Sequence, residues 1–221
     1  MATLDPHLTF ENFVVGPANR LAAAAARRAA ERPGVSYNPL FIYGPHGLGK
    51  THLLGAIARH AAKVSPGKTV HFETSQGFLS RVVEDMEDKG KEDLRERYRD
   101  ADILLLDDVQ FLTAEPHVQD ILLLTLDALA QEGKQAVLAS DRPPADIEGL
   151  AAHLRTRFES GLLVTMGPPE YETRVAIVQK VAETFRHVLG PGVPDAIGGI
   201  PYRSVAEILG ALDRILEIQD V

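Results

Sequence analysis

Short apolar runs alternate along the chain with longer segments in which apolar residues recur every three or four positions. The first pattern is typical of β-strands and the second of amphipathic helices. The candidate strands are residues 40–43, 69–74, 103–106 and 136–139. Because helical segments separate these runs, the sequence predicts an α/β fold with a doubly wound, mostly parallel sheet.

The predicted strands differ in polarity, and this difference indicates their places in the sheet. Residues 103–106 and 136–139 are continuously apolar, as expected for strands that are covered on both faces. Residues 69–74 instead alternate apolar and polar side chains. We therefore expect this strand to have one polar side and to lie near an edge of the sheet.

Beyond Pro168-Pro169 only helical patterns follow. A helix is predicted from Glu170 to about Leu189, and a last helix begins at Ser204 with a wide apolar face. The stretch between them, around Gly198-Gly199, has only a weak pattern. We therefore expect three parts: an N-terminal linker over residues 1–19, an α/β core over 20–167 and a small helical lid over 168–221.

The composition fits one larger soluble domain or two small ones. The chain has 221 residues, of which 45% are hydrophobic and 24% charged. No apolar run reaches the roughly 20 residues of a membrane span, so we expect no membrane-spanning segment and no signal peptide. The absence of cysteine excludes disulfides and thiolate metal sites and is compatible with a cytoplasmic protein.

The formal net charge of −8 limits how the chain can bind nucleic acid. Such a chain repels DNA at long range, so DNA binding must depend on a local basic patch. Lys91, Arg95 and Arg99 recur every four residues and form a candidate stripe on one helix face. The surrounding segment, residues 76–100, has six basic and eight acidic residues, a net charge of −2. A solvated helix face with ion pairs therefore remains the other interpretation.

The glycine-rich stretch after the first predicted strand has the pattern of a phosphate-binding loop. Gly44 begins G-x-x-x-x-G-K-T, and an apolar helical run follows Thr51. In such a loop, backbone N–H groups and the helix N-terminus bind the phosphates, Lys50 reaches the terminal phosphates and Thr51 ligates Mg²⁺. We expect a nucleoside triphosphate to contact Gly44, Pro45, His46, Gly47, Leu48, Gly49, Lys50, Thr51 and His52.

Acidic residues follow the two continuously apolar strands. Asp107 and Asp108 come directly after residues 103–106, where one acid can hold Mg²⁺ and the other can orient or deprotonate the attacking water. Adjacent residues of a strand point to opposite faces, so we expect different roles for the two. Asp141 follows residues 136–139 and precedes two prolines, where it can sense the γ-phosphate or form an Asx turn.

Two arginines lie close together on a short predicted helix. Arg155 and Arg157 are two residues apart, and side chains with that spacing diverge on a helix. One of them could reach the nucleotide of a neighbouring subunit. The other interpretation is a pair of ordinary surface arginines with ion pairs.

Several motifs occur together and in a fixed order: residues 12–20, 37–44, 47–52, 96–99, 107–112, 140–144 and 154–161. In this combination the chain resembles the bacterial replication initiator DnaA family over nearly its whole length. The resemblance implies the AAA+ P-loop NTPase fold with a C-terminal helical lid. It also implies ATP or ADP with Mg²⁺ as cofactors.

The resemblance also implies roles for individual residues. Residues 13–19 would surround the adenine, with contacts from Val14, Val15 and Asn19. Asp107 and Asp108 would be the Walker B acids, Asp107 holding Mg²⁺ with Thr51, and Asp141 would be sensor 1. Arg157 would be an arginine finger acting on a neighbour's ATP, either in a second copy of the chain or in the full-length initiator. Lys91, Arg95 and Arg99 would fall in the family's insertion, which is associated with single-stranded DNA.

The chain departs from the family pattern at its C-terminal end. Ala206 stands where a sensor 2 arginine would be expected, so we expect weaker coupling between lid and ATP. His153 likewise replaces an expected arginine. No helix-turn-helix domain follows the last helix, so no element for reading duplex DNA sequence is visible, and the chain is either a fragment or a stand-alone relative.

The resemblance implies an ATP-binding module that oligomerises with ATP in the initiation of chromosomal DNA replication and hydrolyses ATP slowly. Two alternatives stay open. One is a short DnaA-like regulator that controls the initiator through its arginine finger. The other is an ATPase of the helicase-loader type.

Overall fold

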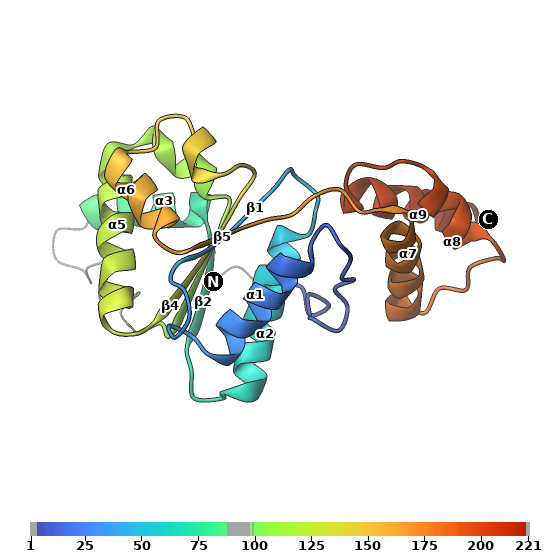
Figure 1. The fold of residues 1–221 in the computed structure, drawn as a ribbon, viewed down its shortest axis with the longest axis horizontal. Helices are drawn as coiled ribbons and strands as arrows, with labels where there is room; N and C mark the ends of the chain where they lie inside the picture. The colour runs from blue at the N-terminus through green and yellow to red at the C-terminus, as the bar shows by residue number, and fades with distance from the viewer. Residues whose placement is uncertain (1–3, 88–97, 99, 220–221) are drawn as a thin grey trace.

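The computed structural model describes residues 4–87, 98 and 100–219, and its core is a parallel sheet covered by helices on both faces (Figure 1). The strands of this sheet run in the order β2-β3-β4-β1-β5, and every pair is parallel. The strands are β1 (Leu40–Tyr43), β2 (Val70–Thr74), β3 (Ile103–Asp107), β4 (Gln135–Ser140) and β5 (Leu162–Thr165). The predicted doubly wound sheet is confirmed.

The places of the strands agree with their polarity. β3 and β4 lie inside the sheet and are buried along their whole length. β2 lies at an edge, as its alternating pattern predicts. The apolar pattern does not predict β5, which is only four residues long and pairs with β1 at the other edge of the sheet. Its few apolar residues do not distinguish a strand from the end of the preceding helix.

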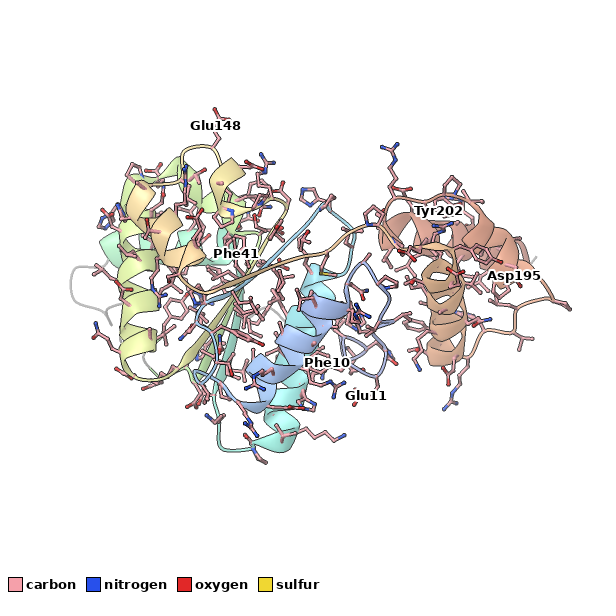
Figure 2. The ribbon with its side chains drawn as sticks, in the orientation of Figure 1. Phe10, Glu11, Phe41, Glu148, Asp195 and Tyr202 are labelled. Atoms are coloured by element: carbon pink, nitrogen blue, oxygen red, sulfur yellow. The ribbon has the colours of Figure 1, made fainter. Side chains whose placement is uncertain are left out.

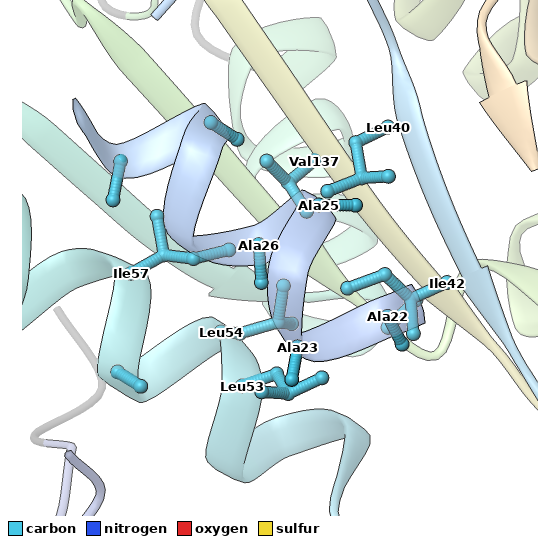
Figure 3. Close-up of a cluster of buried hydrophobic side chains, with 14 of the residues drawn as sticks. Ala22, Ala23, Ala25, Ala26, Leu40, Ile42, Leu53, Leu54, Ile57 and Val137 are labelled. Atoms are coloured by element: carbon cyan, nitrogen blue, oxygen red, sulfur yellow. The ribbon is translucent and has the colours of Figure 1, made fainter. Parts of the chain in front are cut away.

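Helices α1 (Arg20–Glu31) and α2 (Lys50–Val64) cover one face of the sheet. The buried side of α1 consists of alanines, which let its backbone come close to α2 and the strands. Figure 3 shows these small side chains beside the larger apolar side chains of α2, β1 and β4. The labelled residues are Ala22, Ala23, Ala25, Ala26, Leu53, Leu54, Ile57, Leu40, Ile42 and Val137.

The second face is covered by α3 (Ser75–Glu87), α5 (Pro116–Gln131) and α6 (Ala152–Glu159). Short 3-10 helices η1 (Val109–Ala114) and η2 (Pro144–Asp146) follow β3 and β4. α3 covers the first half of the charged segment, residues 76–100. Lys91, Arg95 and Arg99, the candidate basic stripe, lie outside the described residues.

The C-terminal helices form a separate bundle with a hydrophobic cluster of its own, seen at the right of Figure 1. They are α7 (Tyr171–Phe185), α8 (Val193–Gly199) and α9 (Val205–Gln219). α7 ends before the predicted Leu189, because Arg186 adopts a left-handed conformation with φ 58°. α8 occupies the stretch around Gly198 in which the sequence shows only a weak pattern.

The N-terminal segment, residues 4–19, lies between the core and this bundle. On the core side, Phe10 packs edge-on against the His60 ring with 5.5 Å between centroids, and the Arg27 guanidinium lies 4.7 Å from the Phe10 centroid. On the bundle side, Thr184 Oγ1 donates to Asn12 Oδ1 at 3.3 Å. Figure 2 shows Phe10 and its neighbour Glu11 between the two parts. Among the described residues, no helix has the length and apolar character to cross a membrane.

Candidate nucleotide site

The phosphate loop, residues 44–51, connects β1 to α2 and is shaped by its glycines. Gly44 has φ 154°, and a Cβ there would stand 2.2 Å from the Met166 carbonyl oxygen. Gly47 has φ 75°, a left-handed conformation that disfavours side chains. The sharp turn of the loop therefore needs glycine at these positions, as the motif predicts.

Lys50, the first residue of α2, lies inside the curve of this loop. Its side chain is 6% exposed, and Nζ donates to the carbonyl oxygens of Gly44 at 2.7 Å and Pro45 at 3.0 Å. Burial lowers the pKa of Lys50, and the nearby carboxylates of Asp107, Asp108 and Asp141 partly oppose that shift. The structure thus brings the loop lysine and all three predicted acids together at the carboxyl ends of the strands.

Asp107 ends β3 and is 3% exposed. Its Oδ2 accepts a hydrogen bond from Thr51 Oγ1 at 2.5 Å, and its Oδ1 accepts one from the Asp108 N–H at 2.9 Å. Burial raises the pKa of Asp107, since the ionised form loses its hydration. A carboxylate beside a hydroxyl at a phosphate loop is the donor pair with which proteins hold Mg²⁺ on a nucleotide. Asp107 and Thr51 therefore fit that ion.

Asp108 has surroundings different from those of Asp107. It leaves the strand in a left-handed conformation with φ 57°, and its Oδ1 accepts a hydrogen bond from Gln110 Nε2 at 3.1 Å. The Oε1 of the same Gln110 accepts the backbone N–H of Asp141 at 3.2 Å. One buried amide therefore connects the residues that directly follow β3 and β4.

Asp141 begins the loop after β4, where its carboxylate is held from the side. Arg142 donates to it through two nitrogens, Nε at 2.7 Å and NH2 at 2.8 Å. His46 Nε2, from the phosphate loop, lies 3.4 Å from Asp141 Oδ2. The hydrogen bonds from Arg142 lower the pKa of Asp141. The carboxylate is thus kept charged next to the phosphate loop.

A cavity of about 110 Å³ lies where the N-terminal segment, the phosphate loop and the helical bundle meet. Asn19 shapes its wall: Oδ1 accepts the N–H of Gly16 at 2.9 Å, and Nδ2 donates to the carbonyl oxygen of Val14 at 3.0 Å. Of the expected adenine contacts, Val14 and Asn19 line the cavity, whereas Val15 lies outside the lining and is 54% exposed. The lining also contains Phe13, Leu48, Gly49, His52, Ile177, Lys180 and Leu209.

His52 fastens the N-terminal segment to α2. Its Nε2 donates to the carbonyl oxygen of Thr9 at 2.8 Å, and its ring meets the Phe13 ring edge-on at 5.2 Å. Burial lowers the pKa of His52, so the ring is kept neutral. The side chain thereby connects the end of the phosphate loop to the segment that lines the cavity.

The helical bundle meets the phosphate loop through backbone groups. The carbonyl oxygen of Gly47 accepts the N–H of Val205 at 2.8 Å and the N–H of Ala206 at 3.2 Å. Ser204 Oγ accepts the N–H of Glu207 at 3.2 Å, which is half of a capping box at the start of α9. Ala206, which stands where the resemblance suggests an arginine, therefore lies directly beside the loop.

The structure places Arg157 away from these residues and ties it to its own chain. Its guanidinium donates to Asp127 Oδ1 at 2.8 Å, the Asn38 carbonyl oxygen at 3.0 Å and the Leu126 carbonyl oxygen at 3.1 Å. The side chain is only 13% exposed. By contrast, the Nε atom of Arg155 is buried with no hydrogen-bond partner among the described residues. His153 lies 3.2 Å from Asp120 at the surface.

Sequence reasoning missed two residues of the site, Gln110 and Arg142. Both lie within two residues of a predicted acid in the chain, so the sequence shows that they are near the site. It does not show their side-chain directions, because the strands end there and the loops follow no periodicity.

Comparisons with known proteins identify relatives of the chain. The profile of the bacterial DnaA ATPase domain family matches residues 4–165. The chromosomal replication initiator protein DnaA of Deinococcus radiodurans is 44% identical over 214 residues, which are 97% of this chain and 46% of that protein. The chain therefore spans about half the length of this relative.

Solved structures give the same result. The structure of domain III from the Thermotoga maritima replication initiation protein DnaA has a TM-score of 0.94 and 40% identity, covering 99% of this chain and 91% of that one. A replication initiator DnaA bound to AMPPCP and single-stranded DNA has a TM-score of 0.87 and 37% identity, covering 96% of this chain and 65% of that one.

Proposed function

The chain belongs to the bacterial DnaA ATPase domain family, and we propose that it binds ATP, hydrolyses it slowly and uses it to assemble in the initiation of DNA replication. One observation carries this proposal. Lys50, the Thr51–Asp107 pair, Asp108 and Asp141 converge at one edge of the sheet, beside a cavity that ends at the phosphate loop.

In this proposal the phosphates of ATP lie in the loop of residues 44–51, with the base in the cavity beside Val14 and Asn19. Lys50 exchanges its contacts with the loop carbonyls for the phosphates. Thr51 and Asp107 hold Mg²⁺, which supplies charge neutralisation between the phosphates. Asp108 orients the attacking water and accepts its proton. Asp141 is the sensor 1 residue on the γ-phosphate side of the loop, where the Arg142 guanidinium on its carboxylate offsets the repulsion between the two negative groups.

Assembly would bring Arg157 of one copy to the ATP of the next. For this, its guanidinium must leave Asp127 and two backbone carbonyls of its own chain. Breaking these contacts costs free energy, so we propose that ATP-driven assembly is coupled to the release of Arg157 from its own chain. Single-stranded DNA is a proposed ligand, supported by the related initiator that was solved with it.

The alternatives from the sequence analysis are less well supported. The regulator and the helicase loader both require a nucleotide site, so the site does not separate them from an initiator. The relatives at 44% and 40% identity are named as replication initiators, which does not favour either alternative.

The test is nucleotide binding and hydrolysis with Mg²⁺. We expect Lys50→Ala to weaken ATP binding about 10- to 100-fold, because it removes a charge-assisted contact worth roughly 1.5–3 kcal/mol. Lys63→Ala, at the far end of the same helix and exposed, is the matched control and should bind ATP like the wild type. Equal loss in both variants, or no binding by the wild type, would contradict the proposal.

Assembly needs a separate measurement. Sedimentation in the presence of ATP or ADP should show larger species with ATP. If ATP and ADP give the same distribution at concentrations that saturate the site, ATP-dependent assembly is wrong while ATP binding stands.

A further inference from the structure

Gln110 makes a connection that the motif alone does not explain. It lies in η1, directly after the acids of β3, and its side chain is held between two of the predicted catalytic positions. Nε2 donates to Asp108 Oδ1 at 3.1 Å, and Oε1 accepts the N–H of Asp141 at 3.2 Å. Asp108 and Asp141 follow neighbouring strands, β3 and β4.

The orientation of this amide is determined by its partners. A carboxylate accepts hydrogen bonds and a backbone N–H donates one, so only one of the two amide orientations satisfies both. Gln110 is 8% exposed, and a buried amide that lost either partner would be left unsatisfied. The side chain therefore behaves as a rigid bridge of fixed polarity.

The bridge formed by Gln110 restrains the carboxylate of Asp108. Asp108 follows the last residue of β3 and has φ 57°, and the hydrogen bond from Gln110 is the one that the described residues make to its carboxylate. Asp141, by contrast, is held by Arg142 through two hydrogen bonds. Gln110 thus holds the carboxylate of Asp108 in a fixed position relative to the Asp141 backbone.

We infer that Gln110 is a positioning residue for hydrolysis. It holds the carboxylate of Asp108 toward the attacking water and at a fixed position relative to Asp141. This inference rests on the proposed ATPase function. Gln110 is not among the residues that line the cavity, and its side-chain hydrogen bonds go to Asp108 and Asp141, so we expect it to affect the hydrolytic step and to leave nucleotide affinity unchanged.

A simpler role is possible for a buried glutamine, and the same chain contains an example. Gln119 on α5 is 3% exposed and joins the loop before α6 to η1: it donates to the carbonyl oxygens of Gly149 at 3.0 Å and Thr113 at 3.3 Å and accepts the Ala151 N–H at 2.8 Å. Its partners are backbone groups only. Gln119 is therefore a control for burial and bridging without contact to a predicted catalytic acid.

The experiment compares Gln110→Met, Gln110→Glu and Gln119→Met. Methionine keeps the volume and removes both hydrogen bonds, whereas glutamate still accepts the Asp141 N–H but repels Asp108. The measurements are the ATP dissociation constant, the single-turnover hydrolysis rate at saturating ATP and the midpoint of thermal unfolding.

We expect both Gln110 variants to bind ATP within about twofold of the wild type and to hydrolyse it roughly 10- to 100-fold more slowly, with glutamate at least as slow as methionine. Gln119→Met should lower the unfolding midpoint and keep the wild-type rate per bound ATP. A wild-type rate in Gln110→Met, or an equal fall in rate in Gln119→Met, would overturn the positioning role.

The outcomes separate this inference from the function on which it rests. A wild-type chain that binds ATP without hydrolysing it would overturn the ATPase activity and the role of Gln110 together. A wild-type chain that hydrolyses ATP, with Gln110→Met equally active, would overturn the role of Gln110 alone.

Discussion

Ala206 lies against Gly47: the Ala206 Cβ is 3.0 Å from the point where a Cβ on Gly47 would stand. The first turn of α9 therefore rests on the phosphate loop, with two backbone N–H groups bonded to the Gly47 carbonyl oxygen. In this chain the bundle meets the loop by close backbone contact and not through a charged side chain at that position.

An arginine at this position should add the missing charge. We expect Ala206→Arg to raise the ratio of ATP to ADP affinity about tenfold, since a guanidinium at the start of α9 can reach the terminal phosphates. Ala206→Leu adds bulk without charge and should not change the ratio. Titration of both variants with ATP and ADP is the measurement, and equal ratios in the two variants would contradict the prediction.

The buried Asp107 should cost stability in the nucleotide-free protein. Burial raises the pKa of Asp107 above its ordinary value of 3.8. The protonated side chain therefore favours the folded state below pH 3.8, and this contribution to stability is lost as pH rises through the folded-state pKa, where the buried group becomes charged. We expect Asp107→Asn to stabilise the free protein at pH 7 by roughly 1 kcal/mol and to lose this gain in acid.

The same substitution should weaken the effect of Mg²⁺ on ATP binding, because an amide is a poorer ligand than a carboxylate. Urea unfolding at both pH values measures the first effect and ATP titration with and without Mg²⁺ the second. Asp213→Asn, at an exposed position on α9, is the control and should change neither.

Arg157 should stabilise its own subunit, whatever it does in an assembly. We expect Arg157→Ala to lower the free energy of unfolding by roughly 2 kcal/mol, since it removes the donor to the Asn38 carbonyl and the charged hydrogen bond to Asp127. Arg155→Ala, two residues earlier on the same helix, removes a side chain whose Nε has no partner among the described residues and should cost less. Urea unfolding of monomeric protein decides between them, and equal costs would show that the contacts of Arg157 contribute little.

Asn19 should control how the cavity recognises a base. Its amide fixes the backbone at Val14 and Gly16. We expect Asn19→Ala to weaken ATP binding roughly tenfold and to reduce the preference for ATP over GTP, because the wall of the cavity loses two hydrogen bonds worth about 1 kcal/mol each. Asn19→Asp keeps the acceptor for Gly16 and should fall between alanine and wild type. An unchanged preference in Asn19→Ala, measured by competition, would remove Asn19 from the recognition of the base.

Local sequence patterns predict the fold class and the phosphate loop of the site. The phosphate loop, the acids that follow β3 and β4 and the polarity of β2 are local patterns, because strand burial and loop chemistry leave a record in consecutive residues. β5 and α8 escaped prediction because each is short and has too few apolar positions to establish a period.

Contacts between side chains of different elements are visible only in the folded chain. Gln110 bridges β3 and β4, Ala206 touches Gly47 and Arg157 is bonded to α5, and each contact joins positions whose spacing in the chain carries no signal. These contacts depend on strand register, on the direction of each side chain where an element ends and on how the bundle rests on the core. A periodic pattern records which face of an element is buried, but not which residue of another element it will touch.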